Sequence, residues 1–210
     1  MRIVAVRRCR GHQVAVTTDD GNETLLDKRT FEESPYGVDS FLSCEEWDAL
    51  CEKSAQDRMR EKAVFLLSKR DYSRRELERK LCREKGQFHR ERCEDAAEAA
   101  TYMETLGYVN DASYAARLAE QYHTVRLYPR RRIVEKLCEK GIEREVAREA
   151  VNALCGDDAQ LALEFLKKKR YTVPMNTEET EKQAAALARY GFSGEDIRRA
   201  MRWRQEEENE

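Results

Sequence analysis

Two clusters of arginine are the residues in this chain whose type and spacing best suit a chemical role. They occupy equivalent positions in two similar segments, residues 72–82 and 128–138. The clustered side chains are Arg74, Arg75, Arg130, Arg131 and Arg132. Guanidinium groups bind carboxylates and phosphates through paired hydrogen bonds. The helix dipole slightly disfavours cations at a helix start, so their recurrence there favours contact with an anionic partner. The alternative is an ordinary solvated helix face.

A third basic run, residues 167–170, ends a later predicted helix. Cations are favoured at a helix C-terminus, so simple capping is an alternative to partner binding at this run. Combining the three basic regions gives one predicted set of partner-binding residues. The set consists of Arg70, Arg74, Arg75, Lys80, Arg130, Arg131, Arg132, Lys136, Lys167, Lys168 and Lys169.

No arrangement of residues predicts catalysis, a cofactor or a metal. Cys82, His89 and Cys93 could be considered as zinc ligands, but their spacing fits no standard pattern and a fourth ligand is missing. Buried structural thiols are the better interpretation. The three histidines form no recognisable triad order, and no glycine-rich phosphate loop occurs. We therefore expect a protein that is not an enzyme.

The composition points to a thin core and an exposed, charged surface. Charged residues make up 38% of the 210 residues and hydrophobic residues 40%, and the net charge is only −2. Basic residues concentrate around the two arginine clusters, whereas the last residues, 206–210, are mostly acidic.

The seven cysteines include no CxxC motif, and we expect all seven as free thiols in a reduced, cytoplasmic protein. No signal peptide or membrane-spanning run is apparent.

The elements that must position the arginines are helices in a repeat of about 50 residues. Glycines at 86, 141 and 191 mark the repeat as expected helix ends. Ser43 and Ser73 each begin a capping box. The helix after Ser43 should reach about Ser54 and merge into or precede the first repeat helix. Further helices are expected near residues 73–86, 92–105, 111–124, 129–141, 143–154, 157–169, 177–190 and 193–204.

Before these helices, the first 40 residues predict a small β-meander or hairpin. The expected strands are residues 2–8, 13–18 and 23–27. The predicted fold is therefore mostly α, an array of three three-helix repeats with a small N-terminal β extension. Its expected divisions are residues 1–57 for the β extension and a helix, 58–110 and 111–156 for repeats one and two, and 157–210 for repeat three with the acidic tail.

The repeat signature resembles the RecX family of bacterial regulators of the RecA recombinase. The resemblance covers roughly residues 58–204. It is carried by Leu66 to Leu77 (LLSKRDYSRREL) with Lys80-Leu81 and Gly86, by Leu106 to Ala115 (LGYVNDASYA), and by Pro129 to Ile133 (PRRRI) with Leu137 and Lys140-Gly141-Ile142.

The resemblance implies that the repeats form a curved, mostly α-helical array that binds the RecA filament on DNA, and we expect the protein to be a monomer. It implies modulation, chiefly inhibition, of RecA ATP hydrolysis, filament extension and strand exchange, and so a role in homologous recombination, DNA repair and the SOS response. Weak direct DNA binding would accompany it, with no membrane contact.

Two rival interpretations stay open. A helical-repeat protein could bind nucleic acid through the same basic faces without RecA, with a steep salt dependence. A purely structural scaffold would tolerate charge reversal of the arginines. The tyrosines beside basic residues could stack on bases, although packing at helix turns is the commoner role. These tyrosines are Tyr72, Tyr108, Tyr114, Tyr122, Tyr128 and Tyr171.

Overall fold

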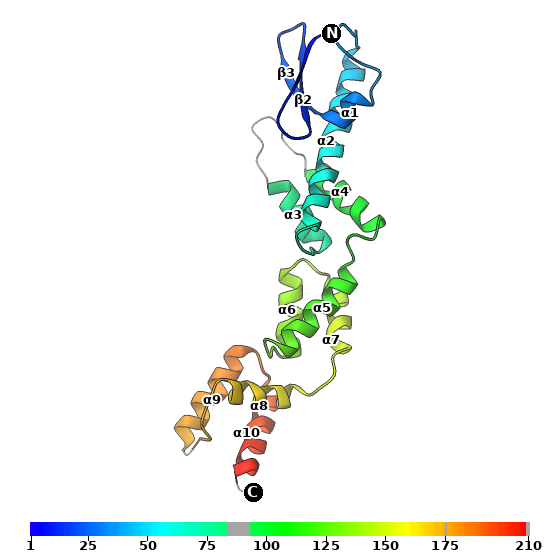
Figure 1. Ribbon diagram of the computed structural model, residues 1–210. Coiled ribbons are helices and arrows are strands. Elements are labelled where there is room, and N and C mark those ends of the chain that lie inside the picture. The colour runs from blue at the N-terminus through cyan, green and yellow to red at the C-terminus, as the bar shows by residue number, and fades with distance from the viewer. Residues whose placement is uncertain (84–92, 175, 209–210) are drawn as a thin grey trace. The chain divides into compact units, whose positions relative to one another are not determined.

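The computed structural model describes residues 1–83, 93–174 and 176–208 (Figure 1). The chain divides into two compact units, Met1–Val109 and Asn110–Glu210. The first holds the small sheet and the first repeat, and the second holds the other two repeats. The prediction of a mostly helical chain with a small N-terminal sheet is confirmed. The expected boundary between repeats one and two, after residue 110, stays a prediction.

The N-terminal sheet is an antiparallel meander of β1 (Ile3–Arg8), β2 (Gln13–Thr18) and β3 (Glu23–Asp27), in the order β1-β2-β3. Its strands match the expected ranges to within one residue. A sheet this small needs a covering element to be stable. The following helices supply one, because their residues form a single buried cluster with side chains from all three strands. The cluster contains Ile3, Val14, Val16, Leu26, Phe31, Leu42, Trp47 and Leu50.

The sheet is followed by a short helix and then a long one. Helix α1 (Lys28–Glu32) was not anticipated, and its N-cap is Asp27. Helix α2 (Cys44–Leu67) begins at the predicted capping box, where Ser43 and Glu46 exchange hydrogen bonds. It continues unbroken past Ser54, so it merges into the first repeat. The expected limit between residues 57 and 58 lies within this one helix.

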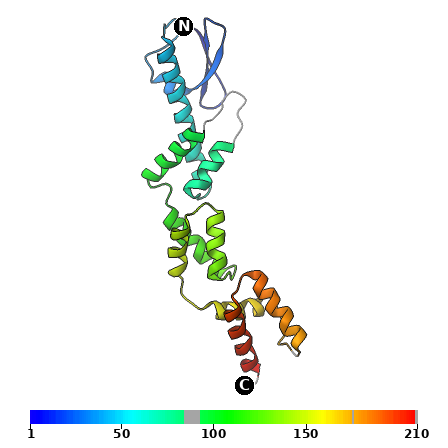
Figure 2. The same cartoon turned by 180° about the vertical axis from the view of Figure 1, so that it is seen from behind.

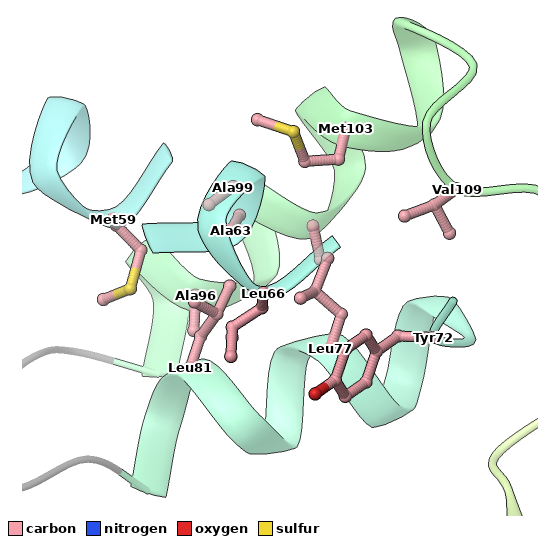
Figure 3. Close-up of a cluster of buried hydrophobic side chains, with 11 residues drawn as sticks. Met59, Ala63, Leu66, Tyr72, Leu77, Leu81, Ala96, Ala99, Met103 and Val109 are labelled. Atoms are coloured by element: carbon pink, nitrogen blue, oxygen red, sulfur yellow. The ribbon is translucent and has the colours of Figure 1, made fainter. Parts of the chain in front are cut away.

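The first repeat combines the end of α2 with α3 (Arg74–Arg83) and α4 (Cys93–Thr105). The three helices can be followed from both sides in Figures 1 and 2. Figure 3 shows Leu77 and Leu81 of α3 directed toward Leu66 and Ala96. Both leucines of α3 are completely buried, as their helical spacing predicts. The predicted helix stop at Gly86 lies outside the described residues.

The second repeat consists of α5 (Asp111–Thr124), α6 (Arg130–Glu139) and α7 (Arg144–Asn152). Asn110, one of the two residues expected to cap α5, does so by accepting from the Ser113 amide. Gly141 ends α6 at φ 88°, a left-handed conformation that favours glycine. Ile133 and Leu137 of α6 are fully buried, the counterparts of the two leucines of α3.

The third repeat consists of α8 (Asp158–Lys168), α9 (Thr177–Tyr190) and α10 (Gly194–Glu208). Helix α9 has the expected bounds and ends at Gly191. Helix α10 continues to Glu208, beyond its expected end at Arg204. The extension is rich in glutamate, which is a good helix former, so the acidic tail up to Glu208 is helical.

The thiol prediction is wrong at two positions. Cys82 and Cys93 form a disulfide that joins the end of α3 to the start of α4, with Cα atoms 5.3 Å apart. The sequence pattern hid this pair because the two cysteines lie 11 residues apart, and only the packing of α3 on α4 brings them together. The five other cysteines are free.

Two further expectations concern membranes and metals. No helix in the described ranges is both long and apolar enough to cross a membrane. No group of potential metal ligands occurs among those residues either.

Candidate partner-binding site

The α3 cluster is anchored partly within its own repeat. Arg74 extends toward α4, where its guanidinium donates to the Thr101 hydroxyl at 3.2 Å and lies 3.6 Å from the Glu104 carboxylate. Its side chain is still 43% exposed. Arg74 therefore braces α3 against α4 and keeps one side open to solvent.

Arg70 lies in the turn that leads into α3. Its guanidinium lies 3.7 Å from the centroid of the Tyr72 ring and 2.9 Å from the Glu76 carboxylate. Tyr72 is buried against the core of the repeat, so Arg70 packs on a rigid surface. The predicted packing role of the tyrosines is confirmed for Tyr72 and for the buried Tyr114, whereas Tyr108 is exposed.

Arg75 and Lys80 are the exposed predicted residues of α3. The Arg75 carbonyl accepts a hydrogen bond from the Arg79 guanidinium one turn along the same helix. Lys80 makes no hydrogen bond or ion pair with any residue that the structure describes. A partner could reach both cations without disturbing the buried face of α3, which is formed by Leu77 and Leu81.

Helix α6 begins with three arginines and no acidic residue in its first turn. Arg130 connects this helix to the third repeat. Its guanidinium donates to Asp158 at 3.0 Å and to the carbonyls of Leu154 and Gly156 at 2.9 and 2.8 Å. Its backbone amide also donates to Asp158. Arg130 therefore closes the linker between α7 and α8.

Arg132 packs on two aromatic rings that also contact each other, with their centroids 5.3 Å apart. Its guanidinium lies 4.4 Å from the Tyr128 ring centroid and 4.6 Å from that of Tyr190. It donates to the Tyr190 carbonyl at 2.6 Å. Burial raises the pKa of the Tyr190 hydroxyl, which donates to the Arg126 carbonyl. Arg132 thus fastens α6 to the end of α9.

Arg131 is the cluster member that α6 leaves in solvent. Its side chain is 84% exposed and lies 3.4 Å from Glu135, one turn along the helix. Exposed pairs of this kind contribute little to stability. Lys136 lies further along α6 and pairs with Glu139, and this hydrogen bond raises the pKa of the lysine.

The lysine run at the end of α8 is exposed, and its lysines have contacts within the chain. Lys168 donates to the Val125 carbonyl at 2.9 Å, and Lys169 lies 6.0 Å from the Phe165 ring centroid. Lys167 is also exposed. Lys168 therefore binds the C-cap residue of α5, and both the capping alternative and the binding role of the run stay predictions.

The structure therefore sorts the clustered residues into two kinds. Arg130 and Arg132 hold repeats together and Arg74 braces one repeat, whereas Arg75 and Arg131 are exposed, as is Lys80.

Sequence reasoning missed the groups that engage the structural arginines. Asp158, which binds Arg130, is one of these groups. The neighbouring Asp157 caps α8 through the Ala159 amide and pairs with Arg199. These contacts lower the pKa of its carboxyl, the amide hydrogen bond most of all. The pair of aspartates that follows Gly156 signals a helix start, but it does not reveal which arginine either aspartate binds.

The fold and the basic helices define a class of helical-repeat proteins, in which three-helix units follow one another and the second helix of the first two units is basic. A family model described as the second three-helix domain of RecX matches residues 110–151. Regulatory protein RecX of Chromohalobacter salexigens is 34% identical over 145 residues, which cover 68% of this chain and 90% of that protein. Regulatory protein RecX of Stenotrophomonas maltophilia is 30% identical over 145 residues, 68% of this chain and 85% of that one.

The chain belongs to the RecX family. Two crystal structures share its fold. One, of a regulatory protein RecX, has a TM-score of 0.69 at 16% identity and covers 95% of this chain and 98% of its own. The other, RecX from Lactobacillus salivarius, has a TM-score of 0.62 at 20% identity and covers 73% of this chain and 98% of its own. The resemblance drawn from the repeat signature is thus confirmed at the level of the family.

Proposed function

We propose that this protein is a non-catalytic regulator that binds the RecA filament on DNA and restrains ATP hydrolysis, filament extension and strand exchange. It would do so as a monomer in the cytoplasm. Membership of a family of regulatory proteins supports the general role. The observation that carries the specific proposal is the basic second helix, which occurs in two consecutive repeats with an exposed arginine at the same repeat position, Arg75 and Arg131.

The chemistry of these helices suits an acidic or phosphate-bearing surface. Guanidinium groups bind carboxylates and phosphates through forked hydrogen bonds. In α6 the positive end of the helix dipole adds to the charge of the first-turn arginines. A filament of protein on DNA offers the same groups at every repeat, so one chain with two basic helices can engage neighbouring sites at once. Two linked contacts strengthen binding more than either alone.

The test is RecA ATP hydrolysis and filament length on single-stranded DNA with increasing amounts of this protein. We expect inhibition at less than one copy per RecA, since a bound copy can block extension of a cooperative filament. No change in ATP hydrolysis, filament length or strand exchange at excess protein would overturn the proposal.

The residues are tested with a charge-matched pair of triple variants. Arg75→Glu, Lys80→Glu and Arg131→Glu reverse the three exposed cations of the predicted set in α3 and α6. Lys53→Glu, Arg148→Glu and Lys182→Glu make the same charge change at exposed positions of α2, α7 and α9. The first triple variant should weaken inhibition by about tenfold or more, because repulsion between like charges replaces attraction, and the second should keep most of it. Equal inhibition by both would place the contact surface elsewhere.

The alternative function is nucleic-acid binding without RecA, for which the same basic helices are suited. Binding to bare DNA distinguishes it. If the first triple variant no longer binds DNA but still binds preformed filaments, α3 and α6 serve nucleic acid and the RecA contact lies elsewhere.

A further inference from the structure

A groove lies in the N-terminal unit, between the turn that joins β1 to β2 and the C-terminal half of α2. Its volume is about 490 Å³, large enough for a nucleotide-sized group. The turn contributes Arg10, Gly11, His12 and Gln13, and α2 contributes Arg58, Glu61, Lys62 and Phe65. None of these residues belongs to the predicted partner-binding set.

The described residues of the groove carry a net positive charge. Arg10, Arg58 and Lys62 line it as permanent cations, and Glu61 is the carboxylate among its described lining residues. The Glu61 carboxylate lies 3.7 Å from the imidazole of His12, so it faces the turn. Arg10 is exposed and makes no hydrogen bond or ion pair with any described residue. The net positive charge suits an anionic occupant.

Helix α2 presents its groove residues in one row. Arg58, Lys62 and Phe65 follow at intervals of four and three residues, which puts them on a single face of the helix. The Phe65 ring is 60% exposed although it borders a groove, and Lys69 lies 5.1 Å from its centroid. An exposed aromatic ring flanked by cations is a surface on which a nucleic-acid base can stack.

The turn opposite α2 leaves room for an approaching chain. Gly11 adopts φ 78°, and a Cβ added there would meet nothing within 4 Å. The turn is held in place by backbone hydrogen bonds, from the Cys9 amide to the Gln13 carbonyl at 3.0 Å and from the Lys28 amide to the His12 carbonyl at 2.9 Å. The groove therefore has one wall fixed by the sheet and one fixed by a long helix.

We propose that this groove binds single-stranded nucleic acid, with Arg10 and Lys62 contacting phosphates and Phe65 stacking on an unpaired base. The site uses no residue of α3 or α6 and needs no RecA. Charge complementarity argues for a polyanion, and the exposed ring argues for one that carries free base faces. A duplex hides its bases, and an acidic peptide offers Phe65 no planar base to stack on.

The test measures the anisotropy of a fluorescein-labelled 20-mer of deoxythymidine with the full-length protein and no RecA, between 25 and 200 mM NaCl. Arg10→Glu should weaken binding about tenfold at low salt. It should also lower the slope of log affinity against log salt by about 0.7 for each phosphate that the variant no longer binds. Phe65→Ala should weaken binding about fivefold or more, because the base can no longer stack.

Two matched control variants lie in helix α2. Lys53→Glu makes the same charge change as Arg10→Glu at an exposed site on the face of α2 opposite to Lys62, and it should leave the salt slope unchanged. Val64→Ala removes the exposed apolar neighbour of Phe65 and should bind as the parent protein does. Circular dichroism verifies that all four variants fold.

Three results would overturn the proposal. Arg10→Glu could weaken binding no more than Lys53→Glu, which would indicate only an overall charge effect. Phe65→Ala could bind as tightly as Val64→Ala, which would remove the stacking contact. A glutamate homopolymer of equal charge could compete as well as the oligonucleotide, which would make the groove a general polyanion site.

Discussion

Helices α3 and α6 carry the same repeat signature, but their arginines have different surroundings. In α3 the first arginine, Arg74, contacts α4 of its own repeat. In α6 its counterpart, Arg130, binds the linker and α8 of the next repeat. Two positions further, α3 has Glu76, which pairs with Arg70, whereas α6 has Arg132, which packs on two neighbouring tyrosine rings. The second arginine of each cluster is exposed in both helices.

The difference teaches that a recurring basic motif need not have a single role. A repeat followed by another repeat in the same compact unit can use its cations to hold the next one. The arginines therefore fall into two groups, those that a partner can reach and those whose removal would destabilise the fold. The free energy of unfolding of single variants can distinguish the two groups.

The largest expected effect on stability is at Arg132. Arg132→Ala removes a charged hydrogen bond and two cation–π contacts, so the free energy of unfolding should fall by about 3 kcal/mol. Urea unfolding in a Trp47→Phe background measures it, because Trp203 then reports on the unit that contains α6. Arg131→Ala is the control and should change stability by less than about 0.5 kcal/mol. Equal effects at the two positions would remove the distinction between inward and exposed arginines.

The next effect concerns Cys82 and Cys138, which occupy the same repeat position. Cys82 is bonded to Cys93, and Cys138 is free. Cys93→Ser should lower the free energy of unfolding by about 2 to 3 kcal/mol under oxidising conditions, because the disulfide no longer closes a short loop. Cys138→Ser should lower it by clearly less.

Thiol titration tests the same contrast. The denatured, unreduced protein should show the five free cysteines, and all seven should react after reduction. If all seven thiols react without reduction, Cys82 is free like Cys138, and the two repeats do not differ at this position.

A smaller contrast is expected between Arg130 and Arg74. Arg130→Ala breaks hydrogen bonds to a carboxylate and two carbonyls and should cost about 2 kcal/mol, whereas Arg74→Ala should cost about 1 kcal/mol, because that side chain is more exposed. Asp158→Ala in the Arg130→Ala background should add less than it does alone, because the two side chains share one interaction. Additive effects of the two substitutions would contradict the pairing.

The smallest effect on stability should come from the exposed pair. Arg75→Glu and Arg131→Glu are each expected to change the free energy of unfolding by less than about 0.5 kcal/mol, since both lie on solvent-facing positions of their helices. Charge reversal should therefore be tolerated at these two arginines but not at Arg130 or Arg132. A large destabilisation at either exposed position, measured by the same urea unfolding, would assign it a structural role instead.

The sequence alone determined most of the local structure. The three strands, the bounds of α5 and α9, the serine capping box of α2 and the buried pair Leu77 and Leu81 all follow from short-range rules. Caps, glycines and helical spacing act over a few residues, so they can be recognised without a structure. The family was also evident, because its signature consists of contiguous motifs.

Only the tertiary structure decided which arginines remain available and which cysteines pair. Arg132 meets Tyr190 across 58 residues, and Arg130 meets Asp158 across 28. The disulfide forms because α3 packs on α4, and the basic groove exists because the β1–β2 turn lies beside α2. Such contacts depend on how helices pack against one another, and helix spacing fixes which face of a helix is buried but not which distant side chain it will meet.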